Sequence, residues 1–327
     1  MTAAFVLAFA LSIAVIAIAR RGSLGERLAD HPNERSLHTK PTPRVGGLGV
    51  MAGASAAIAV AGSADTRVVG ACALALSALS LVDDARGLPA LTRLAAHLSA
   101  GVLAVLACGG SSGAMVAALA VIALAGMANV FNFLDGTDGM AGGMAVAGFG
   151  ALAIAAHRAG APDIALAAGA IASASLAFLA FNAPPAKVFL GDCGSIPLGF
   201  LAAGLGWIGW ERGLWPAWFG PLVFAPFLVD AIVTFARRLA AGERVWQAHR
   251  THYYQRLVTG GWSHRRLAFA AWAWMLLVAA SALVAREAEP MLQRGIIAAW
   301  SILHLAALVA IDRRYPRRPA PAATKAR

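Results

Sequence analysis

Residues 114–139 read AMVAALAVIALAGMANVFNFLDGTDG, an apolar run that passes directly into a cluster of amides and acids. The run carries no charged residue before Asp135, and a helix that crosses the bilayer core needs about 20 such residues. Similar blocks recur along the 327-residue chain, which is 59% hydrophobic and 13% charged, whereas soluble proteins carry about 25% charge. The pattern predicts an all-α polytopic membrane protein.

Eleven apolar blocks predict about eleven transmembrane helices in one domain, residues 1–311. They are residues 3–19, 45–62, 68–82, 92–108, 113–130, 139–156, 163–181, 195–210, 214–236, 266–285 and 291–311. Arg20 and Arg21 follow the first block instead of preceding it, so we expect an uncleaved span and not a signal peptide. Residues 312–327 form a basic, Pro- and Ala-rich segment, expected to be a disordered cytoplasmic tail beside membrane lipid.

Lys and Arg are distributed unevenly between alternate loops. All but five of the 27 lie in one set of loops and in the tail, and the exceptions are Arg67, Arg158, Arg212, Arg286 and Arg294. Because cytoplasmic loops carry the positive excess, this set is assigned to the cytoplasm. The same rule accounts for the net charge of +11, so no nucleic-acid partner is expected.

Five aspartates lie at three span ends on this face: Asp83, Asp84, Asp135, Asp138 and Asp192. One such acid is most simply a helix cap or a solvated interfacial residue, but five beside amides and glycines are not. Facing lipid, each would cost roughly 2.5–3.5 kcal/mol, so a polar cleft is expected. Two carboxylates 4 Å apart repel by about 4 kcal/mol at an effective dielectric of 20, and Mg²⁺ would relieve this repulsion.

Three of the polar residues follow one another at helical spacing. Asn129, Asn132 and Asp135 are three residues apart and share a face while the helix lasts. Amides there suit recognition of ribose, uracil or phosphate. Phe189 is a candidate platform for a stacked base, with an ordinary packing role as the equal alternative.

Two basic loops lie on the same side. Lys40 and Arg44 are in a Pro- and Gly-rich loop, and His249, Arg250 and His252 are in a second one. Lys40 and Arg44 can bind a pyrophosphate or a lipid phosphate, and for either residue a purely topological role is equally plausible. His249, Arg250 and His252 can contact a diphosphate. The His-x-x-His spacing also fits a metal, but no third ligand is near, so hydrogen bonding to phosphate is the better interpretation.

Five segments together carry a resemblance: Pro41–Gly47, Asp83-Asp84, Asn129–Gly139, Phe189–Ser195 and His249–Leu257. In this order they resemble the motifs of the polyprenyl-phosphate N-acetylhexosamine-1-phosphate transferases, of the glycosyltransferase family 4 type. The resemblance covers most of the chain. It implies a Mg²⁺ cofactor, which Mn²⁺ can replace, and two substrates: a UDP-N-acetylhexosamine or deoxy derivative, and undecaprenyl phosphate. The oligomeric state stays open, with a homodimer as one candidate.

The resemblance also implies roles for single residues. Asp192 would bind the metal with help from Asp84, and Asp83, Asp84 and Asp135 would be catalytic. With the loop and amide residues argued above, the predicted substrate contacts are Lys40, Arg44, Asn129, Asn132, Asp138, Phe189, His249, Arg250 and His252. The implied reaction moves a sugar-1-phosphate to the lipid phosphate and releases UMP, directly or through a phospho-aspartyl enzyme.

The sequence of the second basic loop indicates a branch of the family. His249–Leu257 lacks the adjacent histidines of the peptidoglycan translocase and resembles the O-antigen-initiating branch. A phospho-MurNAc-pentapeptide transferase is the alternative within the family. An ion-coupled transporter is a rival, although transporter sites lie at the midplane. A CDP-alcohol phosphotransferase is another, but Asp135–Gly139 lacks the Ala-Arg that its motif requires.

Overall fold

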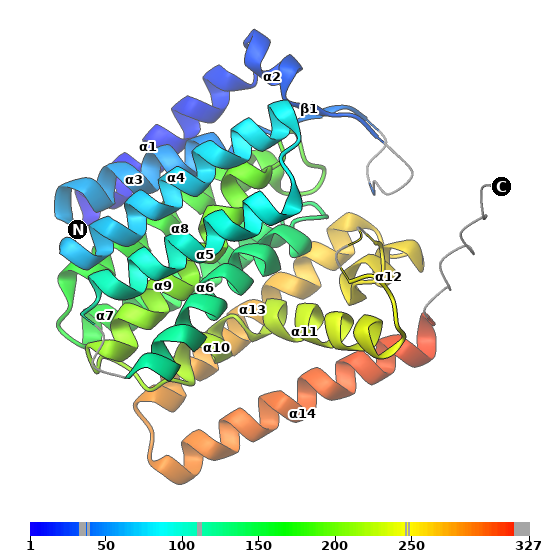
Figure 1. Cartoon of the computed structure of the whole chain (residues 1–327). Coiled ribbons are helices and arrows are strands. Elements are labelled where there is room, and N and C mark those ends of the chain that lie inside the picture. Colours follow the sequence, from blue (N-terminus) through cyan, green and yellow to red (C-terminus); the bar gives the residue numbers. More distant parts are fainter. Residues whose placement is uncertain (33–36, 38–39, 110–112, 246, 248, 317–327) are drawn as a thin grey trace.

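The chain folds almost entirely into helices in the computed structural model (Figure 1), which describes residues 1–32, 37, 40–109, 113–245, 247 and 249–316. The helices are α1 Thr2–Ala19, α2 Ser23–Arg27, α3 Gly46–Ala61, α4 Ala64–Arg86, α5 Ala90–Ala107, α6 Ala114–Leu134, α7 Met140–Arg158, α8 Pro162–Asn182, α9 Asp192–Glu211, α10 Phe219–Val223, α11 Ala225–Ala240, α12 Tyr253–Thr259, α13 His264–Arg286 and α14 Pro290–Arg314. Strands β1 Ala29–Asp30 and β2 Thr42–Pro43 pair antiparallel. The predicted all-α polytopic membrane fold is confirmed.

The number of long apolar helices is smaller than the eleven spans predicted. Within the described part of the chain, nine helices are long and apolar enough to cross a membrane: α1, α4 to α9, α13 and α14. The predicted span 45–62 corresponds to α3, which is apolar but only 16 residues long. The predicted span 214–236 is not a single helix.

This ninth predicted span breaks at Phe224 into α10 and α11. Pro226 lies in the first turn of α11, where its missing N–H costs no helical bond, and it cannot continue α10. α11 then buries Asp230, Thr234 and Arg238 at four-residue spacing. The apolar run 214–236 is therefore two helices, and the second of them carries a stripe of buried polar residues.

The helices differ in how much neighbours cover them. The membrane-spanning windows of α7 and α9 are 72% and 78% buried, against 17% for α1 and 11% for α14. α6 and α9 cross at backbone distance, because a Cβ on Gly199 would lie 2.1 Å from the Met127 carbonyl oxygen. α7 and α9 thus belong to the core, and α1 and α14 lie at the edge.

A proline inside α9 is accommodated by a side chain of α4. Pro197 has no N–H to donate to the Cys193 carbonyl one turn earlier. The buried Ser77 hydroxyl donates to that oxygen instead, over 2.6 Å. A buried unpaired carbonyl would cost about 1–3 kcal/mol, so this bond stabilises the contact of α4 with α9 beside Asp192.

The two ends of the bundle differ in character. We call one the aspartate end, because α4, α6 and α9 bring Asp84, Asp135 and Asp192 there. The β1–β2 hairpin, α12 and the end of α14 lie at this end, and α1 starts at the opposite end (Figure 1). Residues 312–314 of the predicted tail belong to α14, and residues 317–327 lie outside the described residues.

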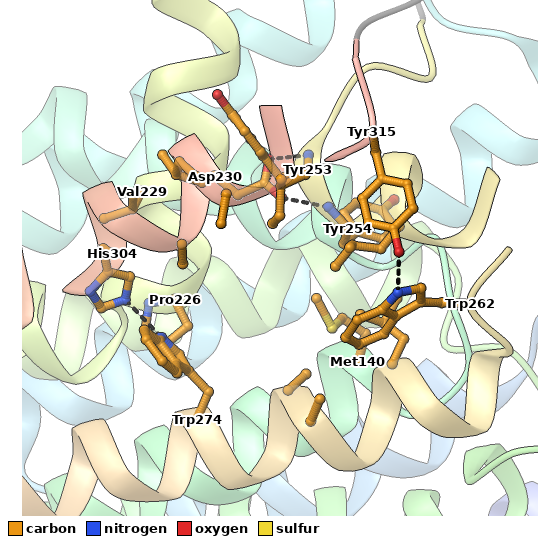
Figure 2. Close-up of a pocket in the computed structure, with 18 of the residues that line it drawn as sticks. Met140, Pro226, Val229, Asp230, Tyr253, Tyr254, Trp262, Trp274, His304 and Tyr315 are labelled. Carbon is orange, nitrogen blue, oxygen red and sulfur yellow. Dashed lines mark hydrogen bonds between the residues drawn. The ribbon is translucent and has the colours of Figure 1, made fainter. Parts of the chain in front are cut away.

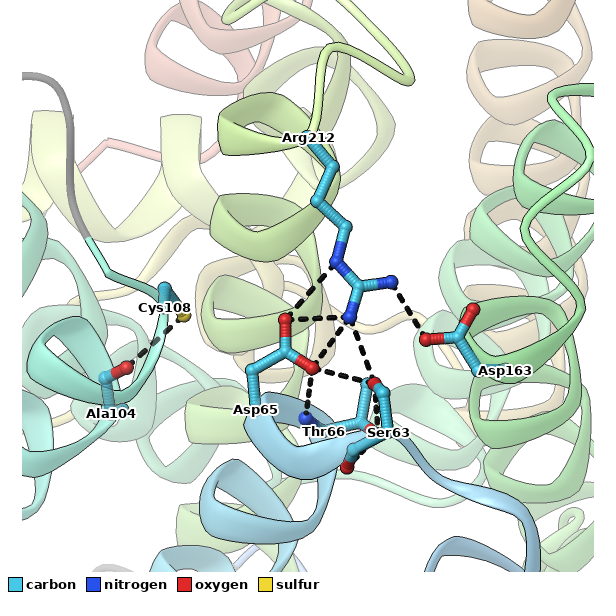
Figure 3. Close-up of polar contacts among 7 residues, drawn as sticks. All are labelled: Ser63, Asp65, Thr66, Ala104, Cys108, Asp163 and Arg212. Atoms are coloured by element: carbon cyan, nitrogen blue, oxygen red, sulfur yellow. Dashed lines mark hydrogen bonds and ion pairs between the residues drawn. The ribbon is translucent and has the colours of Figure 1, made fainter.

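At the opposite end, Arg212 joins three helices (Figure 3). Its guanidinium follows α9 and donates to Asp65 of α4 over 2.6 Å and to Asp163 of α8 over 2.7 Å. The Ser63 hydroxyl accepts a further bond of 2.9 Å. This Arg212 clamp fixes the far ends of α4 and α9, two of the helices that carry the aspartates.

A cavity of about 530 Å³ lies between α11, α13 and α14 (Figure 2). Most lining side chains are apolar, and the polar ones include Asp230, Tyr253 and Arg314 near the aspartate end. The Trp274 indole donates to His304 Nε2 over 3.1 Å and so joins α13 to α14. α14 therefore stands off the bundle and contacts it in a few places.

Candidate active site

Aspartates from three helix ends lie within electrostatic reach of one another. Asp84 is in the last turn of α4, Asp135 follows α6, and Asp192 begins α9. The charge of Asp192 acts on Asp84 and on Asp135, and Asp83 and Asp30 add negative charge at Asp84. The fold therefore brings together carboxylates that are far apart in the sequence.

An amide from α6 orients Asp192. The Asn132 side chain donates to Asp192 Oδ1 over 2.8 Å and to the Ser195 hydroxyl over 3.1 Å. Asp192 also stands at the N-terminus of α9, where the helix dipole favours a negative charge. The predicted site residues Asn132 and Asp192 are thus in direct contact.

The Asp135 carboxyl lies in surroundings that disfavour its charge. Burial raises the pKa of Asp135 well above its usual value, and the neighbouring charge of Asp192 raises it further. A divalent cation would relieve this repulsion, and carboxylate oxygens are the ligands that Mg²⁺ prefers. The donor set therefore fits such an ion.

The described residues do not form a complete metal cage. Among them, no three His, Cys, Asp or Glu side chains are arranged to hold a metal. Mg²⁺ commonly takes one or two protein carboxylates and completes its shell with water and phosphate oxygens. A pair such as Asp192 and Asp84 therefore fits a site that a phosphate-bearing substrate would complete.

Arg44 brings positive charge to the aspartates. Its Nη1 lies 3.7 Å from Asp84 Oδ1, and its Nε is buried without a hydrogen-bond partner. An unpaired buried donor costs about 1–3 kcal/mol. The guanidinium is therefore free to donate to an anionic ligand beside Asp84.

The first turn of α3 and the loop before α9 meet through their main chains. The N–H groups of Gly46 and Gly47 donate to the carbonyls of Phe189 and Leu190 over 2.9 and 2.8 Å. A Cβ on Gly47 would lie 2.4 Å from the Gly194 nitrogen, so only glycine allows this approach. The contact fixes the half-buried Phe189, the predicted stacking residue, at the start of the Asp192 loop.

Asp83 has a different task from its neighbour Asp84. Its carboxylate accepts the Leu88 N–H over 2.6 Å and an Arg93 N–H over 3.0 Å. Asp83 therefore closes the turn between α4 and α5. Both of its oxygens accept a hydrogen bond in this way, and its catalytic role stays a prediction.

Asn129 has other partners than Asp192. Its amide donates to the Ala125 carbonyl of its own helix over 2.8 Å and lies 3.4 Å from His97 Nδ1 of α5. The expected common face of Asn129, Asn132 and Asp135 is therefore divided between two neighbours.

Asp138 is held by protein groups on both oxygens. Oδ1 lies 3.2 Å from His264 Nδ1, and Oδ2 accepts the Ala186 N–H over 3.0 Å. Burial raises the pKa of Asp138, but these hydrogen bonds outweigh burial and leave the pKa below its usual value. His264 also lies 3.1 Å from the Thr137 hydroxyl and donates from Nε2 to the Leu37 carbonyl over 3.1 Å.

In the second basic loop, His252 is buried and held by Asp230, whereas Arg250 is exposed. The rings of His249 and His252 stack at 4.9 Å, and the buried His252 places Nδ1 3.0 Å from Asp230 Oδ1. Arg250 and Lys40 are exposed on their loops. The loop is therefore anchored to α11 through His252.

Sequence reasoning missed three side chains that hold this region together: His264, Asn182 and Tyr254. The Asn182 side chain accepts the Gly139 N–H over 2.8 Å and donates to the Val188 carbonyl over 2.9 Å. The sequence does show that Asn182 ends an apolar span and that His264 begins another, and either position could have marked a polar contact. Nothing in the sequence, however, names their partners.

Comparison with known proteins gives two kinds of relative. Residues 66–209 match the family described as Glycosyl transferase family 4. The phospho-N-acetylmuramoyl-pentapeptide-transferase of Geobacillus thermodenitrificans is 37% identical over 141 residues, which are 43% of this chain and 42% of the relative. The Bacillus subtilis protein of the same name is 35% identical over 141 residues, again 43% of this chain and 42% of the relative.

A second Bacillus subtilis protein aligns over more of its length. The probable undecaprenyl-phosphate N-acetylglucosaminyl 1-phosphate transferase is 26% identical over 312 residues, 90% of this chain and 87% of the relative. The pentapeptide-transferases, in contrast, are matched over about two fifths of their length. The matched segment 66–209 contains Asp84, Asn132, Asp135 and Asp192. By this match, by both kinds of relative and by its helical membrane fold, the chain is similar to glycosyl transferase family 4.

Proposed function

We propose that this protein transfers an N-acetylhexosamine-1-phosphate from a UDP-sugar to undecaprenyl phosphate and releases UMP, as a step in O-antigen or related envelope polysaccharide synthesis. The observation that carries the proposal is the meeting of Asp84, Asp135 and Asp192 at one end of a membrane-spanning bundle. The Bacillus subtilis relative that aligns over most of both chains is named for this type of reaction.

The bonds that change are these. An oxygen of the lipid phosphate attacks the β-phosphorus of the UDP-sugar, a new P–O–P link forms, and the bond to UMP breaks. Asp192 and Asp84 would hold Mg²⁺, which when bound neutralises charge on the diphosphate. Since a phosphate monoester has a second pKa near 6, little proton removal is needed at neutral pH. Positioning by the chain is then the larger task.

The remaining groups are proposed to bind and orient the substrates. Arg44, with its unpaired Nε, donates to the diphosphate, and Phe189 stacks on uracil. Asn132 keeps the Asp192 carboxylate in one orientation. Asp84 is a better proton acceptor than Asp83, because hydrogen bonds to Leu88 and Arg93 occupy both Asp83 oxygens.

The choice of sugar separates two candidates. The long alignment favours a UDP-N-acetylhexosamine donor, and the loop His249–Leu257 lacks adjacent histidines. The higher identity over 141 residues favours the UDP-MurNAc-pentapeptide donor. We favour the hexosamine donor because the alignment with the N-acetylglucosaminyl 1-phosphate transferase spans 90% of this chain and therefore includes the second basic loop.

A donor screen tests the proposal. Purified protein in lipid nanodiscs, undecaprenyl phosphate and Mg²⁺ are mixed with each UDP-sugar, and UMP release is measured with and without EDTA. Asp192→Ala should abolish release, whereas Asp163→Asn should keep it, because Asp163 also begins a helix but belongs to the Arg212 clamp. Absence of UMP with every donor, or ion flux without UMP, would contradict the proposal.

The orientation of the protein is tested separately. We propose that the aspartate end faces the cytoplasm of a bacterial inner membrane. In a Cys108→Ala background, Arg250→Cys should resist a membrane-impermeant thiol reagent in intact spheroplasts, and Arg158→Cys should react. The opposite labelling would place the aspartate end outside.

A further inference from the structure

Asp230 of α11 lies outside the aspartate cluster, yet it is one of the most connected side chains in the described structure. It is 7% exposed. Oδ1 accepts from the Thr234 hydroxyl over 3.1 Å, from His252 Nδ1 over 3.0 Å and from the Tyr253 N–H over 3.0 Å. Oδ2 accepts the Tyr254 N–H over 3.1 Å (Figure 2). Four donors thus converge on one carboxylate.

These contacts decide which nitrogen of His252 carries hydrogen. An ionised carboxylate only accepts hydrogen bonds, and two backbone N–H groups and a hydroxyl already donate to Asp230. The hydrogen between Asp230 and His252 therefore lies on Nδ1 of the imidazole. In the neutral ring, Nε2 is then the nitrogen with the lone pair, and in the charged ring it is a second donor.

The same carboxylate holds the start of α12. The first N–H groups of a helix have no partner within the helix. Here Asp230 accepts those of Tyr253 and Tyr254, and the Gln255 side chain accepts that of His252 over 3.2 Å. Asp230 thus caps α12 from a different helix.

α12 is in turn docked against the end of α6. The Tyr254 hydroxyl donates to the Phe133 carbonyl over 3.0 Å, two residues before Asp135. A Cβ on Gly136 would lie 2.1 Å from that hydroxyl oxygen, so the two segments touch. The ring of His252 lies 6.0 Å from that of Phe133. His252 is thereby placed beside the Asp135 turn.

We propose that Asp230 is a positioning residue for the phosphoryl transfer: it fixes the tautomer and place of His252 and holds α12 against the Asp135 turn. The inference rests on the proposed function and on the predicted hydrogen bonding of His252 to a phosphate of the substrate. Asp230 itself touches no reacting atom. It acts through His252 as the orienting carboxylate of a catalytic dyad does.

Asp312 supplies a matched control. It contacts α12 from the other side, accepting from Arg256 over 2.7 Å, from the Tyr253 hydroxyl over 3.3 Å and from Arg237 over 2.6 Å. Asp312→Asn therefore loosens α12 toward α14 and leaves the bond between Asp230 and His252 intact. Asp230→Asn removes the acceptor that fixes the imidazole.

The kinetic test compares these variants by UMP release. Asp230→Asn should lower kcat by about 100-fold or more, because the wrong tautomer becomes accessible, and Asp312→Asn should stay within about threefold of the wild type. Combining Asp230→Asn with His252→Ala should cost no more than His252→Ala alone, since the two residues act as a unit. Equal losses in the two asparagine variants, or additive losses in the double variant, would overturn the proposal.

A second measurement does not depend on activity. In protein labelled with ¹⁵N-histidine, the His252 signal is identified by its absence in His252→Gln. The wild type should show hydrogen on Nδ1, and Asp230→Asn should lose this preference. A wild-type ring protonated only on Nε2 would sink the inference even if the enzyme is active. If instead no donor releases UMP, the proposed function fails while this measurement still decides whether Asp230 fixes His252.

Discussion

Asn129 and Asn132 stand one turn apart on α6, carry the same side chain and have different partners. Their spacing predicted a shared face, and both were expected to contact substrate. Asn132 donates to Asp192, whereas Asn129 is taken up by the Ala125 carbonyl and by His97. Sequence spacing gives the side of a helix, but the neighbour on that side comes from helix packing. The convergence of Asp192 with Asn132 was therefore predictable, and the contact of Asn129 with His97 of α5 was not.

The two amides give a matched pair of variants. Asn132→Ala should lower UMP release about 10- to 100-fold, because groups that orient a metal-binding side chain contribute on that scale. Asn129→Ala should lower it less than about threefold, since its amide does not contact the aspartates. Initial rates at saturating donor and Mg²⁺ measure both. Equal effects would mean that the Asn132 contact with Asp192 has no role in turnover.

Asp138 should make the stability of the fold depend on pH. Its pKa is lowered overall because hydrogen bonds from His264 and Ala186 outweigh burial. A carboxylate with a depressed folded pKa stabilises the fold above its unfolded pKa, and this contribution is lost as pH falls through the folded value. Asp138→Asn should thus melt at a lower temperature than the wild type at pH 7. The difference should shrink as pH falls below about 4; a gap that stays constant from pH 7 to pH 3 would contradict this assignment.

At the scale of elements, hydrophobic runs predicted nearly every long helix but not how the helices end. The run over 214–236 looked continuous, yet Pro226 divides it into α10 and α11. The length of an apolar run predicts the length of a helix. A break in that helix depends instead on the position of a proline, which has no N–H to donate. The short β1–β2 pair was also invisible, because two-residue strands carry no periodic pattern. In contrast, the Gly46-Gly47 motif marked a real close contact of two elements.

That contact is testable by adding one methyl group. Gly47→Ala places a Cβ 2.4 Å from the Gly194 nitrogen, and because backbone must move, a loss of about 1–3 kcal/mol is expected. Gly126→Ala is the control, since a Cβ there meets nothing within 4 Å and alanine favours a helix by up to about 1 kcal/mol. Melting curves in one detergent compare the two. A Gly47→Ala protein as stable as Gly126→Ala would show that α3 and α9 are not this close.

At the scale of the whole molecule, the bundle separates two kinds of polar cluster. The aspartate end gathers the like charges of Asp84, Asp135 and Asp192, and the opposite end pairs opposite charges in the Arg212 clamp. The uneven Lys and Arg distribution predicted that the loops would fall into two sets. It did not predict the clamp, because Asp65, Asp163 and Arg212 are far apart in the sequence and each looks like an ordinary loop residue.

This separation predicts that stability and activity can be changed independently. Arg212→Met should destabilise the protein by about 0.5–1.5 kcal/mol, because two partly exposed ion pairs are lost and each contributes up to about 1 kcal/mol. Its kcat at 20 °C should remain within about twofold of the wild type. Thermal melting and UMP release measure the two effects. A large fall in kcat without a fall in melting temperature would tie the clamp to catalysis.

Ser77 and Pro197 lie on different helices but constrain each other's evolution. If Ser77 is replaced first, the Cys193 carbonyl is left buried without a hydrogen-bond donor. If Pro197 is replaced first, the new residue at position 197 has an N–H that can donate to that carbonyl within α9. Mutational paths through this pair therefore have a preferred order, and related chains should keep the serine wherever they keep the proline. In the laboratory the same dependence should make Ser77→Ala costly beside Pro197 and nearly neutral beside Pro197→Ala, which a double-mutant cycle of melting temperatures would reveal.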